Sequence, residues 1–241
     1  MPGPLKNIFW KWIFLQKIYL FSLFIGKLCL HDVKNPSKIF LFLRVFPYTM
    51  AGYERLSNAY ELAQQAEREN LKGAFVECGV WKGGTAGTMA YVSRKNQERP
   101  IWLFDSFEGL PEPTSKDGEL AKQFVGACLA PLEEAHRLFF SVLQLQGPNI
   151  HIEKGWFQNT LPQAKERVGP IAILRLDADW YEFTRCILEN LYDNVVPGGY
   201  VIIDDYGHWE GCKKAVDEFL KERNIVANLK KIDYTGVYFQ K

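Results

Sequence analysis

Apolar positions along the chain follow two different spacings, which separate expected helices from expected strands. In residues 53–70, Leu56, Tyr60, Ala63 and Ala66 recur every three or four residues, and this spacing predicts a helix. Residues 85–95 also read as helical. Short apolar runs of strand length, bounded by polar or glycine-rich turns, predict five strands: Ala74–Cys78, Ile101–Asp105, Ile150–Glu153, Ile171–Asp177 and Tyr200–Asp204. Strands that alternate with helices indicate a parallel sheet.

The C-terminal pattern differs from this alternation. Leu229–Asp233 and Gly236–Gln240 are joined by a short Tyr-Thr-Gly turn and predict a hairpin. We therefore expect an α/β fold of Rossmann-like type, a mostly parallel seven-stranded sheet with a C-terminal antiparallel hairpin and one antiparallel strand at its edge. One domain over residues 53–241 is expected, preceded by a helical N-terminal extension or lid over residues 1–52. Residues 108–147 are expected to start as a loop and to become helical from about Pro131.

Two of the predicted strands end in acidic residues. Ile171–Leu176 leads into Asp177 and Asp179, and the strand from Tyr200 leads into Asp204 and Asp205. Carboxylates clustered beside apolar strands are costly unless a cation neutralises them, which makes a metal site the first hypothesis. Neighbouring parallel strands end at the same edge of a sheet, where ligands bind in such folds. For Asp179 a helix-capping role is an equally good interpretation.

Charge and cysteine content narrow the class of partner. The net charge is +1 and the basic residues are scattered, so nothing favours nucleic acid, and a small-molecule substrate is expected. The five cysteines are odd in number and widely spaced, without a C-x-x-C pair. This usage predicts a reducing, cytoplasmic location.

The segment Ile8–Leu30 is the most apolar part of the chain. Lysines at 11, 17 and 27 interrupt it, so it is too short between charges to span a bilayer, and it lacks the layout of a secretory signal. Its polar positions are split around a helical wheel. We interpret it as packing on the domain or on a second subunit of a homo-oligomer, with a membrane-surface anchor as the alternative.

The first strand feeds a glycine-rich turn that opens a helix. The sequence Glu77-Cys78-Gly79-Val80-Trp81 is followed by Gly83-Gly84. Glycines allow close approach of a ligand, and a helix start offers N–H groups to an anionic group. Glu77 can accept hydrogen bonds from an amino group, and Asp105 at the end of the second strand suits the two hydroxyls of a ribose. These spacings predict an adenosyl ligand with a charged amino-acid end.

Five motifs together carry a family resemblance. They are Glu77-x-Gly79, Asp105-Ser106-Phe107-Glu108-Gly109-Leu110-Pro111, Gly155-Trp156-Phe157 with Thr160-Leu161-Pro162, Leu174-Arg175-Leu176-Asp177-x-Asp179, and Gly198-Gly199-x-x-Ile202-x-Asp204-Asp205-Tyr206. In this order, from about Tyr48 to the C-terminus, the chain resembles the macrocin O-methyltransferase family. Members of that family methylate sugar hydroxyls of natural products, as in antibiotic biosynthesis, and depend on S-adenosylmethionine and Mg²⁺.

The resemblance implies a role for each motif. Thr49 and Met50 resemble the segment that folds over the cofactor. Asp177, Asp204 and Asp205 would bind Mg²⁺, which prefers oxygen ligands. The cofactor would be held, from its methionine end to its adenine, by Glu77, Cys78, Gly79, Val80, Trp81, Asp105, Ser106, Phe107, Glu108, Gly109 and Phe157.

The expected reaction needs both a metal and a base. An aliphatic hydroxyl is a poor nucleophile at neutral pH, so the enzyme must position its oxygen and ease its deprotonation. Asp177 is the first candidate for the base, with Asp179 and His208 as further ones. Trp180 and Phe183 stand where the family pattern has other residues, which leaves the acceptor sugar open. A nicotinamide-dependent oxidoreductase and a non-catalytic glycan-binding protein at a membrane surface are the alternative functions.

Overall fold

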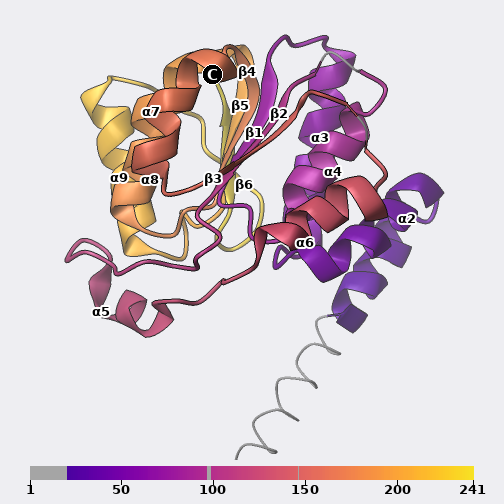
Figure 1. Cartoon of the computed structure of the whole chain (residues 1–241), viewed down its shortest axis with the longest axis horizontal. Coiled ribbons are helices and arrows are strands. Elements are labelled where there is room, and N and C mark those ends of the chain that lie inside the picture. The colour runs from indigo at the N-terminus through magenta and orange to yellow at the C-terminus, as the bar shows by residue number, and fades with distance from the viewer. Residues whose placement is uncertain (1–20, 97–98, 146) are drawn as a thin grey trace, which may run out of the picture. The chain divides into compact units, whose positions relative to one another are not determined.

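A mixed β-sheet organises the larger part of the molecule (Figure 1). The computed structural model describes residues 21–96, 99–145 and 147–241. It divides into two compact units, residues 1–43 and 44–241, so that residues 44–52 are grouped with the larger unit. In the described part of the chain the sheet has seven strands in the order β3-β2-β1-β4-β5-β7-β6.

The strands of the sheet follow the predicted runs closely. β1 (Ala74–Cys78) and β2 (Ile101–Asp105) have the predicted bounds, and the other parallel strands are β3 (Ile150–Lys154), β4 (Ile171–Leu176) and β5 (Val195–Ile203). Every residue of β1 and β4 is buried, as expected for central strands that are covered on both faces. The predicted α/β fold is confirmed.

Helices cover the two faces of the sheet (Figure 1). On one face α3 (Tyr53–Arg68) packs beside α4 (Gly84–Ser93), and on the other face α7 (Phe157–Val168), α8 (Tyr181–Leu191) and α9 (Glu210–Glu222) lie in sequence. In α9 the buried residues Cys212, Ala215, Val216 and Phe219 recur at spacings of three and four. An apolar stripe of this kind holds a helix on a sheet.

The C-terminal strands correct one detail of the prediction. β7 (Val237–Gln240) pairs antiparallel with β5, but the edge position belongs to β6 (Lys230–Lys231), which pairs antiparallel with β7. β6 has only two residues because the chain turns at once: the Asp233 side chain accepts hydrogen bonds from the backbone N–H groups of Thr235 and Gly236. The antiparallel strand is therefore inside the sheet and not at its edge.

β5 also begins earlier than the predicted strand, which started at Tyr200, and it includes Pro197-Gly198-Gly199. α8 ends at Leu191 and is followed by a short 3-10 turn, Tyr192–Asn194, so these three residues lie inside β5. The pairing register between β4 and β5 shifts here, from Ile171 opposite Val195 to Ile173 opposite Tyr200. The irregular stretch absorbs the proline, which cannot donate to the strand ladder, and the left-handed Gly198.

The connection from β2 to β3 is only partly helical. It contains α5 (Gly118–Ala121), the 3-10 turn Lys122–Phe124, α6 (Leu132–His136) and the π-helical turn Arg137–Val142. The expected helical start near Pro131 is confirmed, since α6 begins at the next residue.

The smaller unit is helical in its described part. Residues 21–32 form a helix, and α2 (Pro36–Val45) follows after a short turn, with 3-10 residues Phe46–Tyr48 next along the chain. Phe24 and Phe42 pack with ring centroids 6.1 Å apart, and the buried pair Lys38 and Asp32 is joined at 2.9 Å. Most of the apolar segment Ile8–Leu30 lies outside the described residues. No helix in the described part is both long and apolar enough to cross a membrane.

The turn after β1 depends on a glycine. Gly79 has φ +87°, and a Cβ at this position would lie 1.6 Å from the carbonyl oxygen of Asp177. We expect Gly79→Ala to lower the free energy of unfolding by more than about 2 kcal/mol, because both the backbone angle and the space exclude a side chain. Urea denaturation of the purified variant measures this change.

Gly126→Ala is the matched control for this substitution. Gly126 also has a left-handed φ of +73°, but nothing lies within 4 Å of an added Cβ. Its expected cost is only the backbone strain, about 1 kcal/mol. Equal losses for the two variants would show that the contact with Asp177 does not matter.

Candidate active site

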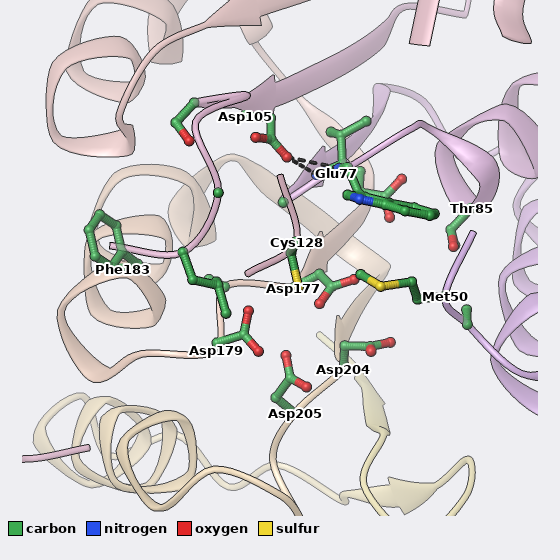
Figure 2. Close-up of a pocket in the computed structure, with 18 of the residues that line it drawn as sticks. Met50, Glu77, Thr85, Asp105, Cys128, Asp177, Asp179, Phe183, Asp204 and Asp205 are labelled. Carbon is green, nitrogen blue, oxygen red and sulfur yellow. Dashed lines mark hydrogen bonds between the residues drawn. The ribbon is translucent and has the colours of Figure 1, made fainter. Parts of the chain in front are cut away.

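A pocket in residues 44–241 opens at the carboxyl ends of four neighbouring strands, β2, β1, β4 and β5. It encloses about 1010 Å³, part of it open to solvent. The chain runs outward from β1 to β2 and β3 on one side and to β4 and β5 on the other, so the pocket sits where the strand order reverses. Figure 2 shows acidic side chains pointing into it from several strand ends.

Arg175 is the charged centre beneath this pocket. It lies on β4, is 1% exposed, and donates hydrogen bonds to three carboxylates: Glu77 of β1, Asp177 after β4 and Asp204 after β5. The bond to Asp177 is 2.9 Å long. A buried guanidinium is tolerated only when such partners neutralise it. The coulombic pull of Asp204, Asp177 and Glu77 outweighs the effect of burial and raises the pKa of Arg175.

Arg55 makes a second contact to the same carboxylate cluster. It projects from the first turn of α3 and donates to Asp204, to Asp233 at 2.8 Å and to Thr235. Asp204 is thereby bound by an arginine at each of its two oxygens. Arg55 therefore ties the start of α3 and the β6–β7 turn to the acidic end of β5.

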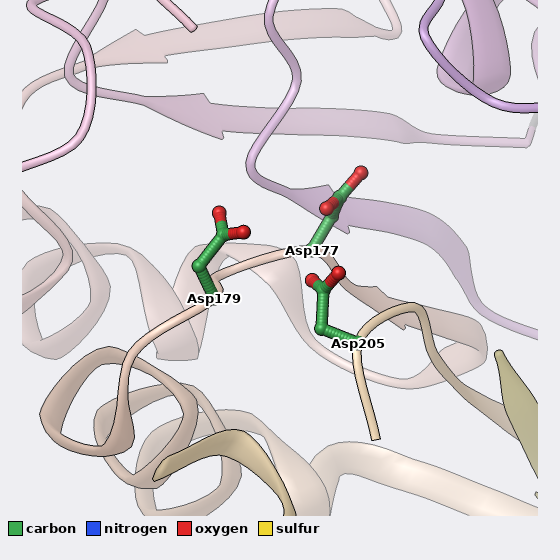
Figure 3. Close-up of side chains that lie close together, drawn as sticks. All are labelled: Asp177, Asp179 and Asp205. Carbon is green, nitrogen blue, oxygen red and sulfur yellow. The ribbon is translucent and has the colours of Figure 1, made fainter. Parts of the chain in front are cut away.

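Asp177 also belongs to a second group of carboxylates, together with Asp179 and Asp205. One oxygen each of Asp177, Asp179 and Asp205 lies within 4.8 Å of the other two, and Figure 3 shows the three side chains projecting to the same side of their loops. Oδ2 of Asp205 is buried and has no hydrogen-bond partner. Burial and the neighbouring carboxylates raise the pKa of Asp179 to about 7 and that of Asp205 well above its usual range. Carboxylate oxygens that lie this close together suit a hard divalent ion such as Mg²⁺, which prefers oxygen ligands.

The backbone and a tryptophan fix the position of Asp179. Its φ is +54°, in the left-handed region, and its side chain accepts a 2.8 Å hydrogen bond from the indole N–H of Trp209. The helix-capping interpretation is wrong: Trp180 is the N-cap of α8, and the N–H of Tyr181 donates instead to Asp117, 2.6 Å away. Because a distant carboxylate satisfies the helix start, Asp179 faces the pocket.

One side of the pocket is formed by the loop after β1. One oxygen of Asp105 accepts hydrogen bonds from the N–H groups of Val80 and Trp81 at 2.6 and 2.8 Å, and the other accepts one from Phe107 at 2.7 Å (Figure 2). Asp105 therefore shapes the loop as well as lining the pocket. Oε2 of Glu77 is buried without a partner, and burial raises the pKa of this side chain to about 8 against the opposing effect of Arg175.

Most of the residues predicted for the site come together in this pocket. The predicted residues that line it are Thr49, Met50, Glu77, Gly79, Val80, Trp81, Asp105, Ser106, Gly109, Phe157, Asp177, Asp179, Asp204 and Asp205. Cys78, Phe107 and Glu108 do not line it: Cys78 and Phe107 are buried in the protein and Glu108 points to solvent. His208 lies outside the lining, with its ring centroid 4.5 Å from that of Trp209.

Several residues that line the pocket were not predicted as site residues from the sequence. Arg55, Thr85 and Cys128 belong to this group, and nothing in their local patterns distinguishes them from surface positions. Phe183 also lines the pocket, with ring centroids 5.9 Å from both Trp156 and Phe157. Trp180 is buried instead, and its indole donates a 2.9 Å hydrogen bond to the carbonyl of Pro111.

Comparison with known proteins supplies the family. The family model described as macrocin-O-methyltransferase (TylF) matches residues 44–241. The chain belongs to the macrocin-O-methyltransferase family. The predicted resemblance and the predicted class of enzyme, an O-methyltransferase, are thereby confirmed, and the oxidoreductase and non-catalytic alternatives are set aside.

Individual relatives agree with the family assignment. Demethyldecarbamoylnovobiocin O-methyltransferase of Streptomyces niveus is 38% identical over 201 residues, which cover 80% of this chain and 76% of the relative. Mycinamicin III 3''-O-methyltransferase of Micromonospora griseorubida is 34% identical, with coverage of 80% and 78%. The solved structure of the O-methyltransferase NovP superposes with a TM-score of 0.73 at 35% identity, covering 80% of this chain and 82% of NovP.

A more distant structure shares the fold. MycE methyltransferase of the mycinamycin pathway, solved with Mg, S-adenosylhomocysteine and mycinamycin VI, has a TM-score of 0.50 at 16% identity over 83% of this chain and 53% of MycE. At that identity it supports the fold alone. The methyltransferase family nevertheless confirms the predicted donor class, S-adenosylmethionine.

The raised pKa of Asp179 has a consequence for stability. A carboxyl group whose folded-state pKa is raised stabilises the fold below its unfolded pKa, and this contribution is lost as the pH rises through the folded value. For metal-free protein, we expect Asp179→Asn to become progressively more stabilising, relative to wild type, between pH 3.8 and about 7. Thermal unfolding across this range, in the presence of a chelator, measures the difference in Tm.

The matched control for this prediction is Asp193→Asn. The hydrogen bond from Arg223 lowers the pKa of Asp193, so the contribution of this side chain changes only below pH 3.8, and the Tm difference between wild type and Asp193→Asn should stay nearly constant from pH 3.8 to 7. A Tm difference between wild type and Asp179→Asn that stays constant from pH 3.8 to 7 would contradict the prediction.

Proposed function

We propose that the chain transfers the methyl group of S-adenosylmethionine to a sugar hydroxyl of a glycosylated natural product or glycan precursor, with Mg²⁺ bound at the acidic strand ends. The observation that carries this proposal is the carboxylate cluster of Glu77, Asp177, Asp179, Asp204 and Asp205, which only Arg55 and Arg175 contact among the arginines of the described residues. Ionised, the five carboxylates outnumber the two guanidinium groups, one of which also binds Asp233. Mg²⁺ and the net positive charge of S-adenosylmethionine would add positive charge to this cluster.

The residues toward the cofactor suit its two ends. The unpartnered Oε2 of Glu77 can accept a hydrogen bond from the ammonium group of the methionine moiety. Asp105 keeps the loop after β1 in place and has lone pairs left for a ribose hydroxyl. The aromatic ring of Phe157, at the start of α7, offers an apolar contact to the adenine.

The residues toward the metal are Asp177, Asp179 and Asp205. The sequence pattern predicted Asp204 in this set, but both of its oxygens are bound by arginines, whereas the three other carboxylates face one another. We therefore assign Asp204 to holding Arg55 and Arg175 in place. When bound, Mg²⁺ supplies Lewis acidity that lowers the pKa of a coordinated hydroxyl.

Proton removal from the acceptor falls to a carboxylate of the pocket. Asp177 is the first candidate, because its side chain is 33% exposed into the pocket and Arg175 holds one of its oxygens. It takes the proton of the sugar hydroxyl while the oxygen forms a bond to the methyl carbon. The carbon–sulfur bond breaks, its electron pair stays on sulfur, and S-adenosylhomocysteine leaves. His208 lies outside the pocket lining and is not assigned this role.

The acceptor side has an apolar wall. Leu110, Pro111, Trp156 and Phe183 line the pocket beside the carboxylates, and such surfaces pack well on the C–H faces of a sugar ring. The relatives described above are named as O-methyltransferases of demethyldecarbamoylnovobiocin and of mycinamicin III, which supports a glycoside acceptor for this chain. A homo-oligomer and a cytoplasmic location stay predictions from the sequence.

The acceptor is testable with a panel of substrates. Glycosides and nucleotide sugars are incubated with enzyme, S-adenosylmethionine and Mg²⁺, and the products are analysed by mass spectrometry. We expect a mass gain of one methylene on a sugar, abolished when Mg²⁺ is chelated. Methylation of an aromatic hydroxyl of the aglycone, with the sugars untouched, would contradict the proposed acceptor class.

Two substitutions separate the cofactor half of the site from the metal half. We expect Asp177→Asn to abolish Mg²⁺-dependent transfer, at least about 100-fold in kcat, with little effect on the Kd of S-adenosylhomocysteine. Glu77→Gln should weaken S-adenosylhomocysteine about tenfold or more, because the buried partner of the ammonium group loses its charge. Isothermal titration and initial rates measure both effects. Undiminished turnover by Asp177→Asn would refute its assigned role.

Substitutions of Asp179 and Asp204 test which of these two aspartates is the third metal ligand. We expect Asp179→Asn to weaken Mg²⁺ binding about tenfold, and Asp204→Asn mainly to lower thermal stability because Arg55 and Arg175 each lose one of their charged partners. Magnesium titrations followed by calorimetry measure the affinities. The reverse result, with Mg²⁺ lost in Asp204→Asn and kept in Asp179→Asn, would restore Asp204 as the ligand.

A further inference from the structure

The smaller unit has an unusual share of exposed apolar side chains. Of the fourteen large hydrophobic residues that are exposed in the described part of the chain, six lie in residues 21–43: Phe21, Leu23, Leu30, Val33, Phe40 and Leu43. Leu30 is 75% exposed and Val33 is 68% exposed. Single exposed apolar residues are ordinary, but a concentration over so short a stretch indicates an interaction surface.

The exposed side chains are arranged on helix faces. In the helix of residues 21–32, Phe24, Leu28 and Asp32 are spaced four apart and buried. Leu23 and Leu30 are seven residues apart, share another face, and are exposed. The turn that follows adds Val33 and the exposed Lys34. Lys27 is four residues after Leu23 and three before Leu30, so helical spacing places a lysine on the same face as these apolar side chains.

The charge of the chain is divided unevenly. Residues 1–43 contain six lysines, no arginine and one aspartate, a net charge of +5. Since the whole chain carries +1, residues 44–241 carry −4. The same 43 residues contain nine aromatic side chains. Lysines interleaved with aromatic and aliphatic residues are typical of segments that bind the surface of an anionic bilayer.

The family match does not include this stretch, because it covers residues 44–241. We propose that the exposed apolar side chains and lysines of residues 21–43 bind the surface of an anionic lipid bilayer, with the apolar side chains entering the interface and the lysines contacting the lipid phosphates. A second copy of the chain is a poorer occupant of this surface, since two units of charge +5 would repel each other. The proposal is independent of the acceptor assigned above.

Vesicle flotation with the full chain tests the proposal. Vesicles of phosphatidylcholine alone are compared with an equal mixture of phosphatidylcholine and phosphatidylglycerol. We expect the protein to float with the mixed vesicles at low ionic strength, to be released by about 1 M salt, and to stay behind with phosphatidylcholine alone, because the attraction of lysines is screened by salt.

Charge-reversal variants locate the contact. Lys27→Glu with Lys34→Glu should lower the partition coefficient for mixed vesicles roughly tenfold or more. The matched control, Lys72→Glu with Lys165→Glu, makes the same change of charge at exposed positions of the other unit and should bind as wild type does. Unchanged S-adenosylhomocysteine binding by both double variants verifies that residues 44–241 are folded.

Three results would overturn the proposal. One is equal binding to both kinds of vesicle, which would remove the requirement for anionic lipid. Another is an equal loss of binding in the control variant, which would move the contact to the other unit. The third is no flotation at all; if light scattering then shows a dimer that Leu30→Asp dissociates, the surface belongs to a second copy of the chain.

Discussion

The burial of Arg175 among Glu77, Asp177 and Asp204 is the constraint on which the rest of the site depends. Neither the guanidinium nor the carboxylates could be buried alone, since each would lose its hydration without compensation. Strand pairing makes the arrangement possible, because Arg175 of β4 lies in register with Glu77 of β1, and Asp204 follows β5. The same arginine thus contacts Glu77 of β1 and the two acids that follow β4 and β5, so that a shift of one strand would disturb all three contacts.

The balance of charge at this site is incomplete without ligands. Arg55 and Arg175 satisfy Asp204, but Asp179 and Asp205 keep raised pKa values through burial and mutual repulsion. Buried carboxylates that repel one another lower the stability of the fold, but they favour the binding of a cation. Sites that bind ligands commonly reduce stability in this way. Arg55 extends this network to the start of α3 and to the β6–β7 turn, two segments that are distant in sequence.

Aromatic residues position the acceptor side. Trp209 donates to Asp179 and packs edge to face against Trp180, with ring centroids 4.9 Å apart, and Trp180 in turn donates to Pro111. The carboxylate and the loop after β2 are therefore held by one pair of rings. Trp180 acts from the core, whereas Phe183 lines the pocket itself. Of the two departures from the family pattern, Phe183 is the one in a position to contact an acceptor.

The sequence by itself determined the strands, the parallel order and the family, because buried strands need continuous apolar runs and the motifs sit at their ends. It also placed Glu77, Asp105 and Asp177 at one sheet edge. The tertiary structure decided which acids meet. Asp179 and Asp204 are equivalent in pattern, each following an apolar run, yet one faces the pocket and the other binds two arginines. Arg55 had no local signal, since its partners are 149 and 178 residues away in the chain. Such pairings arise only from folding, when burial forces each charge to find a partner.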